Sequence, residues 1–182
     1  MIYEEKTMKS EKIYEGRIIN LRLDTVELPD KKYTKREIVE HPGAVAIIPV
    51  TEDNEVVLVK QYRKAVESEL LEIPAGKVEI GENPVTCAVR ELKEETGYSA
   101  KEIQFLFEFY TSPGFSNEKL HLFLAKGLSE GEAEPENDEY IEVCKIKLES
   151  LVEMINNGEL LDSKTVVGVL TLNNILNKED EK

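Results

Sequence analysis

The alternation of apolar and polar residues along the chain predicts mostly β-structure in its first half. Residues 11–40 indicate short strands: the run KIYEGRIINLRLDTVEL alternates, PDKK forms a turn, and YTKREIVEH follows. The continuous apolar run GAVAIIPV predicts a buried strand, and NEVVLVKQYR repeats the pattern after the turn residues TEDN. We therefore expect these last two strands to pair as a β-hairpin that ends at Arg63.

One helix is predicted with defined ends, over residues 84–96. Asn83 suits the N-cap, Pro84 suits the first helical position, and Gly97 suits the residue just past the end. The stripe expected to face the core consists of residues at helical spacing, namely Val85, Ala88, Val89, Leu92 and Thr96.

The second half of the chain continues with three strands and a final helical segment. The strands are IQFLFEFYTS, KLHLFLAKGL and YIEVCKIKL, and the helical segment covers 149–177 with an interruption near NNGELLD. The segment SEGEAEPENDE is typical of an acidic surface loop. Because strands and helices interleave without a regular βαβ rhythm, we expect an α/β (α+β) fold in which helices pack against a mixed sheet.

Composition restricts the classes of function. The 182 residues, 41% of them hydrophobic, suit one ordinary domain, or one domain with a small appendage. We expect no membrane partner, since no run approaches ~18 apolar residues and the opening residues MIYEEKTMKSEK lack a signal-peptide core. Cys87 and Cys144 make no disulfide framework, so a cytoplasmic location is expected. A net charge of −14 argues against nucleic-acid binding but permits a phosphorylated ligand held through a cation.

Acidic residues cluster on the predicted helix. Glu91 and Glu95 lie four residues apart with Glu94 beside them, so the three carboxylates share one face. Like charges at this spacing repel, and a hard divalent cation such as Mg²⁺ would offset the repulsion through oxygen ligands. The alternative is a solvated helix face with Arg90 and Lys93 interspersed.

The surrounding residues decide between these interpretations. The pattern G-x5-E-x7-R-E-x-x-E-E-x-G is matched at every fixed position, from Gly76 through Glu82 to Gly97, and Leu92 and Tyr98 fill its two hydrophobic positions. This pattern resembles the Nudix box, the signature of the Nudix hydrolases. The resemblance implies an α/β/α sandwich and a loop–helix–loop that holds divalent metal to hydrolyse a nucleoside diphosphate linked to another moiety.

The resemblance also implies roles for the residues of the box. Glu91 and Glu95 would be the main metal ligands, and the carbonyl of Ala75 a further ligand. Arg90 and Glu82 would form a supporting pair that orients the glutamates. Glu94 ranks third as a ligand, because hydrogen-bonded support is an equal alternative for it. Mg²⁺ is the expected metal, with Mn²⁺ as the alternative.

Residues outside the box resemble the ADP-ribose pyrophosphatase branch of the family. They are LVKQYRKAVESELLEIPAGK before the box and YTSPGFSNEKLHLFLA after it, with Pro113 in a setting similar to that branch. The alternative for Pro113 is a simple turn between strands. The implied reaction is hydrolysis of ADP-ribose to AMP and ribose 5-phosphate. Other nucleotide sugars or dinucleotides remain alternative substrates, and a non-catalytic ADP-ribose sensor is the alternative outside enzymes.

Further substrate residues follow from the same resemblance. Arg63 would face a substrate phosphate, since its guanidinium suits two phosphate oxygens. Glu72 would lie near the ribose or the metal, and Glu118 would approach the substrate. Arg36 would reach the substrate across a dimer interface. For each of them an ordinary surface position is the alternative. The aromatic candidates for stacking on adenine are Tyr3, Tyr14, Tyr33 and Phe115.

The general base is expected in the acidic loop. The resembling enzymes place a glutamate shortly before a late strand, and Glu139 holds that position here, with Glu136 and Glu142 as competitors. We expect residues 1–42 to form a small antiparallel β region used in homodimerisation, and residues 43–182 to form the Nudix domain.

Overall fold

The computed structural model describes residues 2–134 and 140–180. The chain divides into two compact units, which are described separately. The first unit comprises Met1–Gly43 and Phe109–Leu120, and the second comprises Ala44–Glu108 and His121–Lys182. None of the helices in the described ranges is long and apolar enough to cross a membrane.

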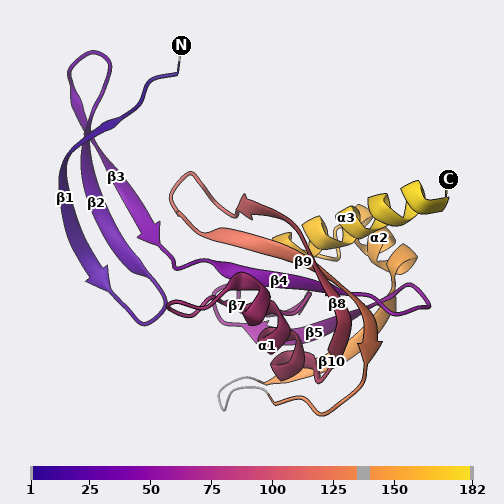
Figure 1. The fold of residues 1–182 in the computed structure, drawn as a ribbon. Helices are drawn as coiled ribbons and strands as arrows, with labels where there is room; N and C mark the ends of the chain where they lie inside the picture. The colour runs from indigo at the N-terminus through magenta and orange to yellow at the C-terminus, as the bar shows by residue number, and fades with distance from the viewer. Residues whose placement is uncertain (1, 135–139, 181–182) are drawn as a thin grey trace. The chain divides into compact units, whose positions relative to one another are not determined.

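The first unit is built on an antiparallel sheet of three strands in the order β1-β2-β3 (Figure 1). The strands are β1 (Lys6–Glu15), β2 (Asn20–Glu27) and β3 (Tyr33–Glu40). The predicted PDKK turn joins β2 to β3, with Lys31 at a φ of 64° and a hydrogen bond of 2.7 Å from the Leu28 N–H to the Lys32 carbonyl. β1 begins earlier than the sequence pattern indicated. All of its residues are exposed, so no buried face produces an alternation by which its start could be recognised.

The second unit contains the remaining strands, arranged in two sheets, except for the end of β8 and the start of β9, which belong to the first unit. The first sheet has the order β7-β4-β9-β8 and the second the order β10-β5-β6. Their bounds are β4 (Ala44–Pro49), β5 (Glu55–Arg63), β6 (Ser68–Glu72), β7 (Ala75–Lys77), β8 (Ser99–Tyr110), β9 (Lys119–Ser129) and β10 (Ile141–Lys147).

The expected hairpin between the strands now labelled β4 and β5 is wrong. The two strands follow each other along the chain but belong to different sheets, and β5 pairs with β6 and β10 instead. Both strands carry long runs of buried residues. A strand covered on both faces shows no alternation that would specify its neighbour, so the sequence could not reveal the correct pairing.

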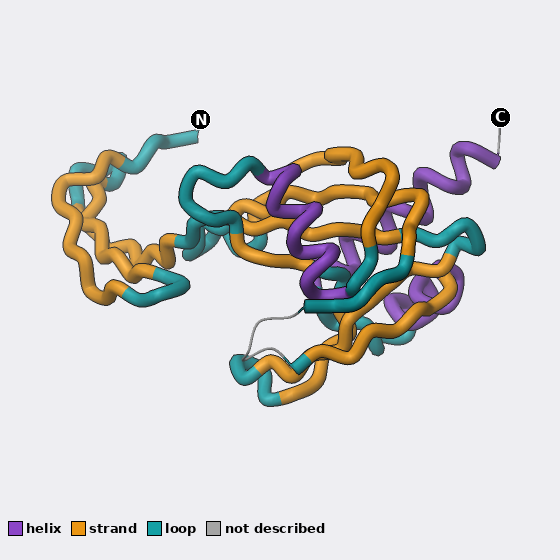
Figure 2. The backbone as a smooth tube through the Cα atoms, turned by 60° about the horizontal axis from the view of Figure 1, so that its bottom comes forward, coloured by secondary structure: helices purple, strands orange, loops and turns teal. Residues whose placement is uncertain are grey.

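Helices cover β4 on both faces, which gives the α/β/α layers (Figures 1 and 2). They are α1 (Pro84–Thr96), α2 (Leu148–Asn156) and α3 (Ser163–Asp180). Val45 and Ile47 belong to the core cluster that includes residues of α1. Ile48, on the opposite face of β4, lies against Gly168 of α3, where an added Cβ would be 3.2 Å from its Cγ1. The expected fold class is confirmed, as are α1 and the interrupted C-terminal helix.

The predicted inward stripe of α1 is partly wrong. Val85 and Val89 are 45% and 51% exposed, whereas Cys87 is fully buried. The buried residues of α1 are Cys87, Ala88, Leu92, Glu95 and Thr96. The helix is therefore turned so that Glu95 lies on the side facing the protein, a position that apolar periodicity alone would not assign to a carboxylate.

Candidate active site

The ends of α1 fix the position of the acidic residues. The Asn83 side chain accepts a hydrogen bond from the Val85 N–H at 2.9 Å, and Pro84 occupies the first turn. At the other end Gly97 has a φ of 76°, and its N–H donates to the Lys93 carbonyl at 2.8 Å. Both caps agree with the prediction, so Glu91, Glu94 and Glu95 lie on the last two turns of a helix with well-defined ends.

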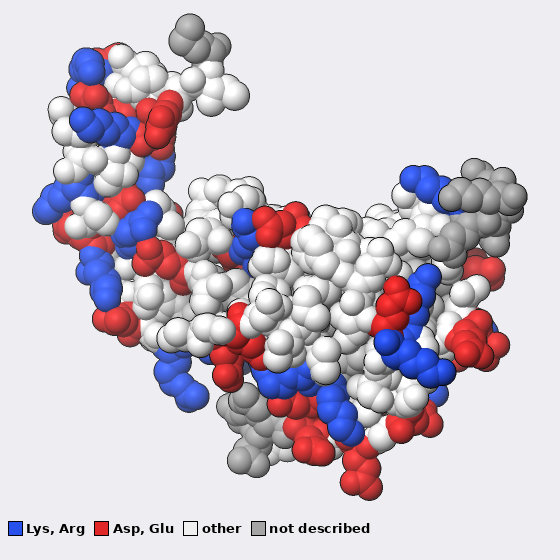
Figure 3. Space-filling view, viewed as in Figure 1, with Lys and Arg blue, Asp and Glu red and all other residues white. Residues whose placement is uncertain are grey.

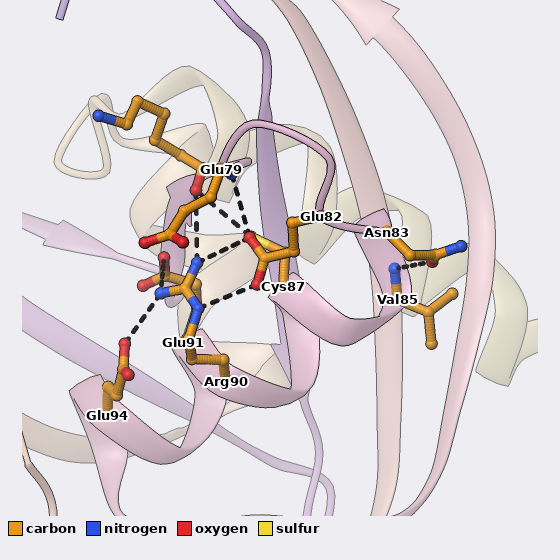
Figure 4. Close-up of polar contacts among 9 residues, drawn as sticks. Glu79, Glu82, Asn83, Val85, Cys87, Arg90, Glu91 and Glu94 are labelled. Atoms are coloured by element: carbon orange, nitrogen blue, oxygen red, sulfur yellow. Dashed lines mark hydrogen bonds and ion pairs between the residues drawn. The ribbon is translucent and has the colours of Figure 1, made fainter.

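Arg90 connects the glutamates of the box (Figure 4). Its Nε and Nη2 donate to the two carboxylate oxygens of Glu82, both at 3.0 Å. Its Nη1 donates to Glu91 Oε1 at 2.8 Å and to Glu94 Oε2 at 2.9 Å. One guanidinium thus contacts three carboxylates, and the predicted pair of Arg90 and Glu82 is present in bidentate form.

These contacts change the titration of neighbouring groups. The hydrogen bonds from Arg90 lower the pKa of Glu82 to about 2, although its partial burial acts in the opposite direction. Burial, together with the nearby Glu82 carboxylate, raises the pKa of the Cys87 thiol to about 12. Glu82 is therefore an ionised partner of Arg90 at neutral pH, and Cys87 stays a thiol that is unsuited to act as a nucleophile.

Strand β7 brings backbone close to two glutamates of α1. The Ala75 N–H donates to Glu95 Oε2 at 3.0 Å, and the Glu95 side chain is buried. A Cβ added to Gly76 would lie 1.9 Å from Glu91 Oε1, so the Glu91 carboxylate occupies the space that a side chain there would need. Glycine at this position is what allows the Glu91 carboxylate to pack against the β7 backbone.

The site suits a divalent cation by the chemistry of its donors. Carboxylate and backbone carbonyl oxygens are the ligands that hard divalent cations prefer, and Glu91, Glu95 and Ala75 supply them from one helix and one strand. Within 2–134 and 140–180, no group of three or more acidic, histidine or cysteine side chains has the spacing of a complete metal site. The Arg90 Nη1 bond occupies Glu91 Oε1, so a cation bound through that oxygen competes with the guanidinium.

Arg63 and Glu72 lie together at a second cluster. The Arg63 Nε and Nη2 donate to the two oxygens of Glu72, both at 2.7 Å. Lys164 also donates to Glu72, and it donates to Asp162 at 3.0 Å. Sequence reasoning missed Lys164 and Asp162. The sequence DSKT before an apolar helix is a recognisable N-cap pattern, but it does not reveal that Lys164 contacts β6.

The expected substrate residues of the first unit are arranged as follows. Arg36 is paired with Glu5, with its Nε 3.0 Å from Glu5 Oε2. Glu118 accepts a hydrogen bond from the Thr111 hydroxyl at 2.6 Å. Pro113 is exposed in a turn that is closed by a 2.9 Å hydrogen bond from the Ser116 N–H to the Ser112 carbonyl. The four candidates for adenine stacking all belong to this unit and are all exposed: Tyr3, Tyr14, Tyr33 and Phe115.

The expected general base, Glu139, and its competitor Glu136 lie outside the described residues. The remaining competitor, Glu142, is exposed on β10 and forms an ion pair of 3.0 Å with Lys60 on the adjacent strand β5. On the face shown in Figure 3, the lysine and arginine side chains of the described residues are scattered among acidic ones and form no single basic patch.

The geometry of this glutamate-bearing helix, with its arginine and adjoining strand, is that of a Nudix hydrolase. The chain belongs to the Nudix family: the NUDIX domain profile matches residues 40–165. A second profile, the nucleoside diphosphate sugar hydrolase N-terminal domain, matches residues 5–39. Nudix hydrolases use divalent metal cations.

Relatives of this chain carry more specific names. An ADP-ribose pyrophosphatase of Bacillus subtilis is 48% identical over 168 residues, which is 91% of each chain. A methanol dehydrogenase activator of Bacillus methanolicus is 48% identical over 170 residues, 92% of each chain. An ADP-ribose pyrophosphatase of Mycobacterium tuberculosis is 36% identical, covering 93% of this chain and 84% of its own. The crystal structure of an ADP compounds hydrolase shares the fold, with a TM-score of 0.86 at 21% identity, over 98% of this chain and 97% of its own.

Proposed function

We propose that this protein hydrolyses the pyrophosphate bond of ADP-ribose, with one water, to AMP and ribose 5-phosphate. The observation that carries the proposal is the 48% identity to an ADP-ribose pyrophosphatase across 91% of both chains. The complete Nudix box, with Glu91 and Glu95 packed against β7, supports it from the structure. Hydrolysis of another nucleotide sugar or of a dinucleotide would use the same residues.

Glu91, Glu95 and the Ala75 carbonyl are the residues that would hold the metal, which we propose to be Mg²⁺ or Mn²⁺. When bound, such a cation neutralises charge on phosphate oxygens and promotes deprotonation of water. Arg90 and Glu82 act by position: their bidentate pair fixes the guanidinium that contacts Glu91 and Glu94. We propose Glu94 as hydrogen-bonded support or as an additional ligand, since it accepts a hydrogen bond from Arg90.

Binding of the phosphates is assigned to Arg63, which sits on the exposed end of β5. Its planar donor pair, now directed at Glu72, can serve two phosphate oxygens equally well. Glu72 holds the guanidinium through these two bonds until a phosphate takes its place. The roles of Arg36, Pro113 and Glu118 rest on sequence resemblance, and single substitutions with separate kcat and KM measurements test each one.

We propose Glu139 as the general base that takes the proton of the attacking water. Its replacement by glutamine is expected to lower kcat by about 10²-fold or more and to leave metal binding unchanged. The same substitution at Glu142 serves as the comparison, because this side chain is already engaged by Lys60. A larger loss at Glu142 than at Glu139 would move the assignment to Glu142.

We further propose that the protein is a cytoplasmic homodimer that associates through its first unit. Met8, Ile13 and Tyr14 of β1 are about half exposed, at 49%, 54% and 57%. Apolar side chains along an edge strand are a suitable surface for a second copy. Light scattering after size exclusion tests the dimer, and Ile13→Glu is expected to convert it to a monomer. The two free cysteines suit a reducing compartment.

Product analysis with a panel of substrates tests the proposed reaction. The panel contains ADP-ribose, ADP-glucose, GDP-mannose, NADH, diadenosine polyphosphates and nucleoside triphosphates, each with Mg²⁺ and then with EDTA. We expect metal-dependent release of AMP with the highest kcat/KM for ADP-ribose. Glu95→Gln should reduce turnover by orders of magnitude, while the exposed Glu102→Gln is the matched control. Tight binding of ADP-ribose without turnover by the wild type would instead indicate a sensor.

A second candidate function is activation of a dehydrogenase. It is favoured by the relative named methanol dehydrogenase activator, which equals the B. subtilis pyrophosphatase in identity to this chain. Adding the protein to a methanol dehydrogenase and following the oxidation of methanol tests it. Comparing wild type with Glu95→Gln then shows whether any activation depends on the hydrolase site.

A further inference from the structure

Glu72 on β6 is a buried carboxylate with two cationic partners. Its side chain is 1% exposed. Arg63 donates two hydrogen bonds of 2.7 Å from one side, and Lys164 of α3 donates to Oε2 from another. Burial alone would raise the pKa of Glu72, but the hydrogen bonds and charges of Arg63 and Lys164 outweigh it and hold the pKa below its ordinary value. Glu72 is therefore ionised and requires at least one cation beside it.

Lys164 is held in place independently of Arg63. Asp162 accepts a hydrogen bond of 3.0 Å from Lys164. The other Asp162 oxygen accepts from the backbone N–H and the hydroxyl of Thr165, at 3.0 and 2.5 Å, at the start of α3. The Thr165 hydroxyl oxygen in turn accepts from the N–H of Ile73, next to Glu72, at 2.8 Å. These contacts fix the beginning of α3 against β6 and leave the Lys164 ammonium directed at Glu72.

The two cations differ in exposure. The Lys164 side chain is 13% exposed, whereas that of Arg63 is 40% exposed. Arg63 is thus the partner that solvent and ligands can reach. A buried carboxylate that loses its only partner is strongly destabilising. With Lys164 in place, Glu72 keeps a partner when Arg63 turns away from it.

We propose that Lys164 is a positioning residue that stays on Glu72 as its counter-ion while Arg63 exchanges Glu72 for a phosphate oxygen of the substrate. The inference rests on the proposed function, because it takes a pyrophosphate as the ligand of Arg63. Lys164 does not touch the substrate in this arrangement. Lys164 lowers the free energy needed to separate Arg63 from Glu72. Its substitution should therefore affect substrate binding rather than the chemical step.

The first test compares Lys164→Met and Lys164→Arg with the wild type. Among the described residues, Lys164→Met leaves Arg63 as the only cationic partner of Glu72. KM for ADP-ribose should therefore rise by roughly tenfold or more, the equivalent of one hydrogen bond to a charged group. We expect kcat to change far less than KM, and Lys164→Arg to restore KM. The exposed Lys147, paired with Glu55, provides the matched control Lys147→Met. A fall in kcat with constant KM would overturn the proposal.

The second test repeats Lys164→Met in an Arg63→Ala background. If Lys164 acts through Arg63, its substitution has little further effect on KM once Arg63 is gone. An equal rise in KM in both backgrounds would show a purely structural role.

Binding of ADP, measured by calorimetry without metal, separates this inference from the proposed reaction. A wild type that does not hydrolyse ADP-ribose refutes the proposed function, but the exchange still predicts weaker ADP binding in Lys164→Met. That weakening should disappear in the Arg63→Ala background. Equal ADP affinity of wild type and Arg63→Ala would refute the inference, since Arg63 would then not bind phosphate.

Discussion

Replacing Gly76 with alanine tests whether the Glu91 carboxylate is a metal ligand. The new Cβ would lie 1.9 Å from the Glu91 carboxylate, whereas ordinary contact begins at 3.4 Å. The carboxylate must therefore move by about 1.5 Å, which is most of a metal–oxygen bond length of ~2.1 Å. Displacement of a ligand on this scale should lower the affinity for the metal by at least tenfold, or about 1.4 kcal/mol.

The assay is calorimetric titration of Mn²⁺ in the absence of substrate, supported by the metal concentration needed for half-maximal turnover. Gly76 has no positive φ and the clash involves the end of a flexible side chain, so we expect the fold to be retained. Gly114→Ala is the control, because a Cβ at that glycine meets no atom within 4 Å. Unchanged Mn²⁺ affinity in a folded Gly76→Ala variant would refute the assignment of Glu91 as a ligand.

Three further outcomes are expected. The pKa of Glu82 is lowered from 4.5 to about 2 in the folded protein. Its pairing with Arg90 therefore stabilises the fold above pH 4.5, and this contribution is lost as the pH falls toward 2. Urea unfolding should show the difference in stability between wild type and Glu82→Gln closing over that range. Leu92→Ala should lower the free energy of unfolding by about 2–5 kcal/mol, because Leu92 is 1% exposed. Val89→Ala should lower it by less than about 0.5 kcal/mol, because Val89 is 51% exposed. Equal losses would contradict the observed orientation of α1. Saturating Mn²⁺ should raise the Tm of the wild type, since a ligand that binds only the folded state stabilises it, and calorimetric scans of Glu95→Gln should show a smaller rise.

The sequence predicted the elements of the fold well and their pairing less well. Caps at Asn83 and Gly97 are local features, and both ends of α1 agree with them. The partners of β5 are non-local, with Gln61 opposite Leu70 on one side and Ile141 on the other. Nothing in a doubly covered apolar strand identifies such neighbours. The hairpin prediction was wrong, and Val85 and Val89 were wrongly predicted to face the core, because both features depend on contacts between residues far apart in the chain.

The same distinction holds for the site. Spacing on one helix was sufficient to group Glu91, Glu94 and Glu95, because residues three and four apart share a face. The contact between Lys164 and Glu72 joins residues far apart in the chain. Lysine at a helix start is common on solvated surfaces. The residue type and position of Lys164 therefore did not distinguish a buried counter-ion from an exposed residue. Only the packing of α3 against β6 reveals it.

Arg90 and Arg63 are anchored alike but differ in their other contacts. Each is fixed by a bidentate pair with one carboxylate, Glu82 or Glu72. At Arg90 the remaining nitrogen, Nη1, is divided between Glu91 and Glu94, so giving up Glu91 to a cation leaves the guanidinium anchored by Glu82. Among residues 2–134 and 140–180, Arg63 donates to no acid other than Glu72, and Lys164 instead holds that acid. The first arrangement therefore favours an arginine that stays in place during catalysis, and the second favours an arginine that moves to the ligand.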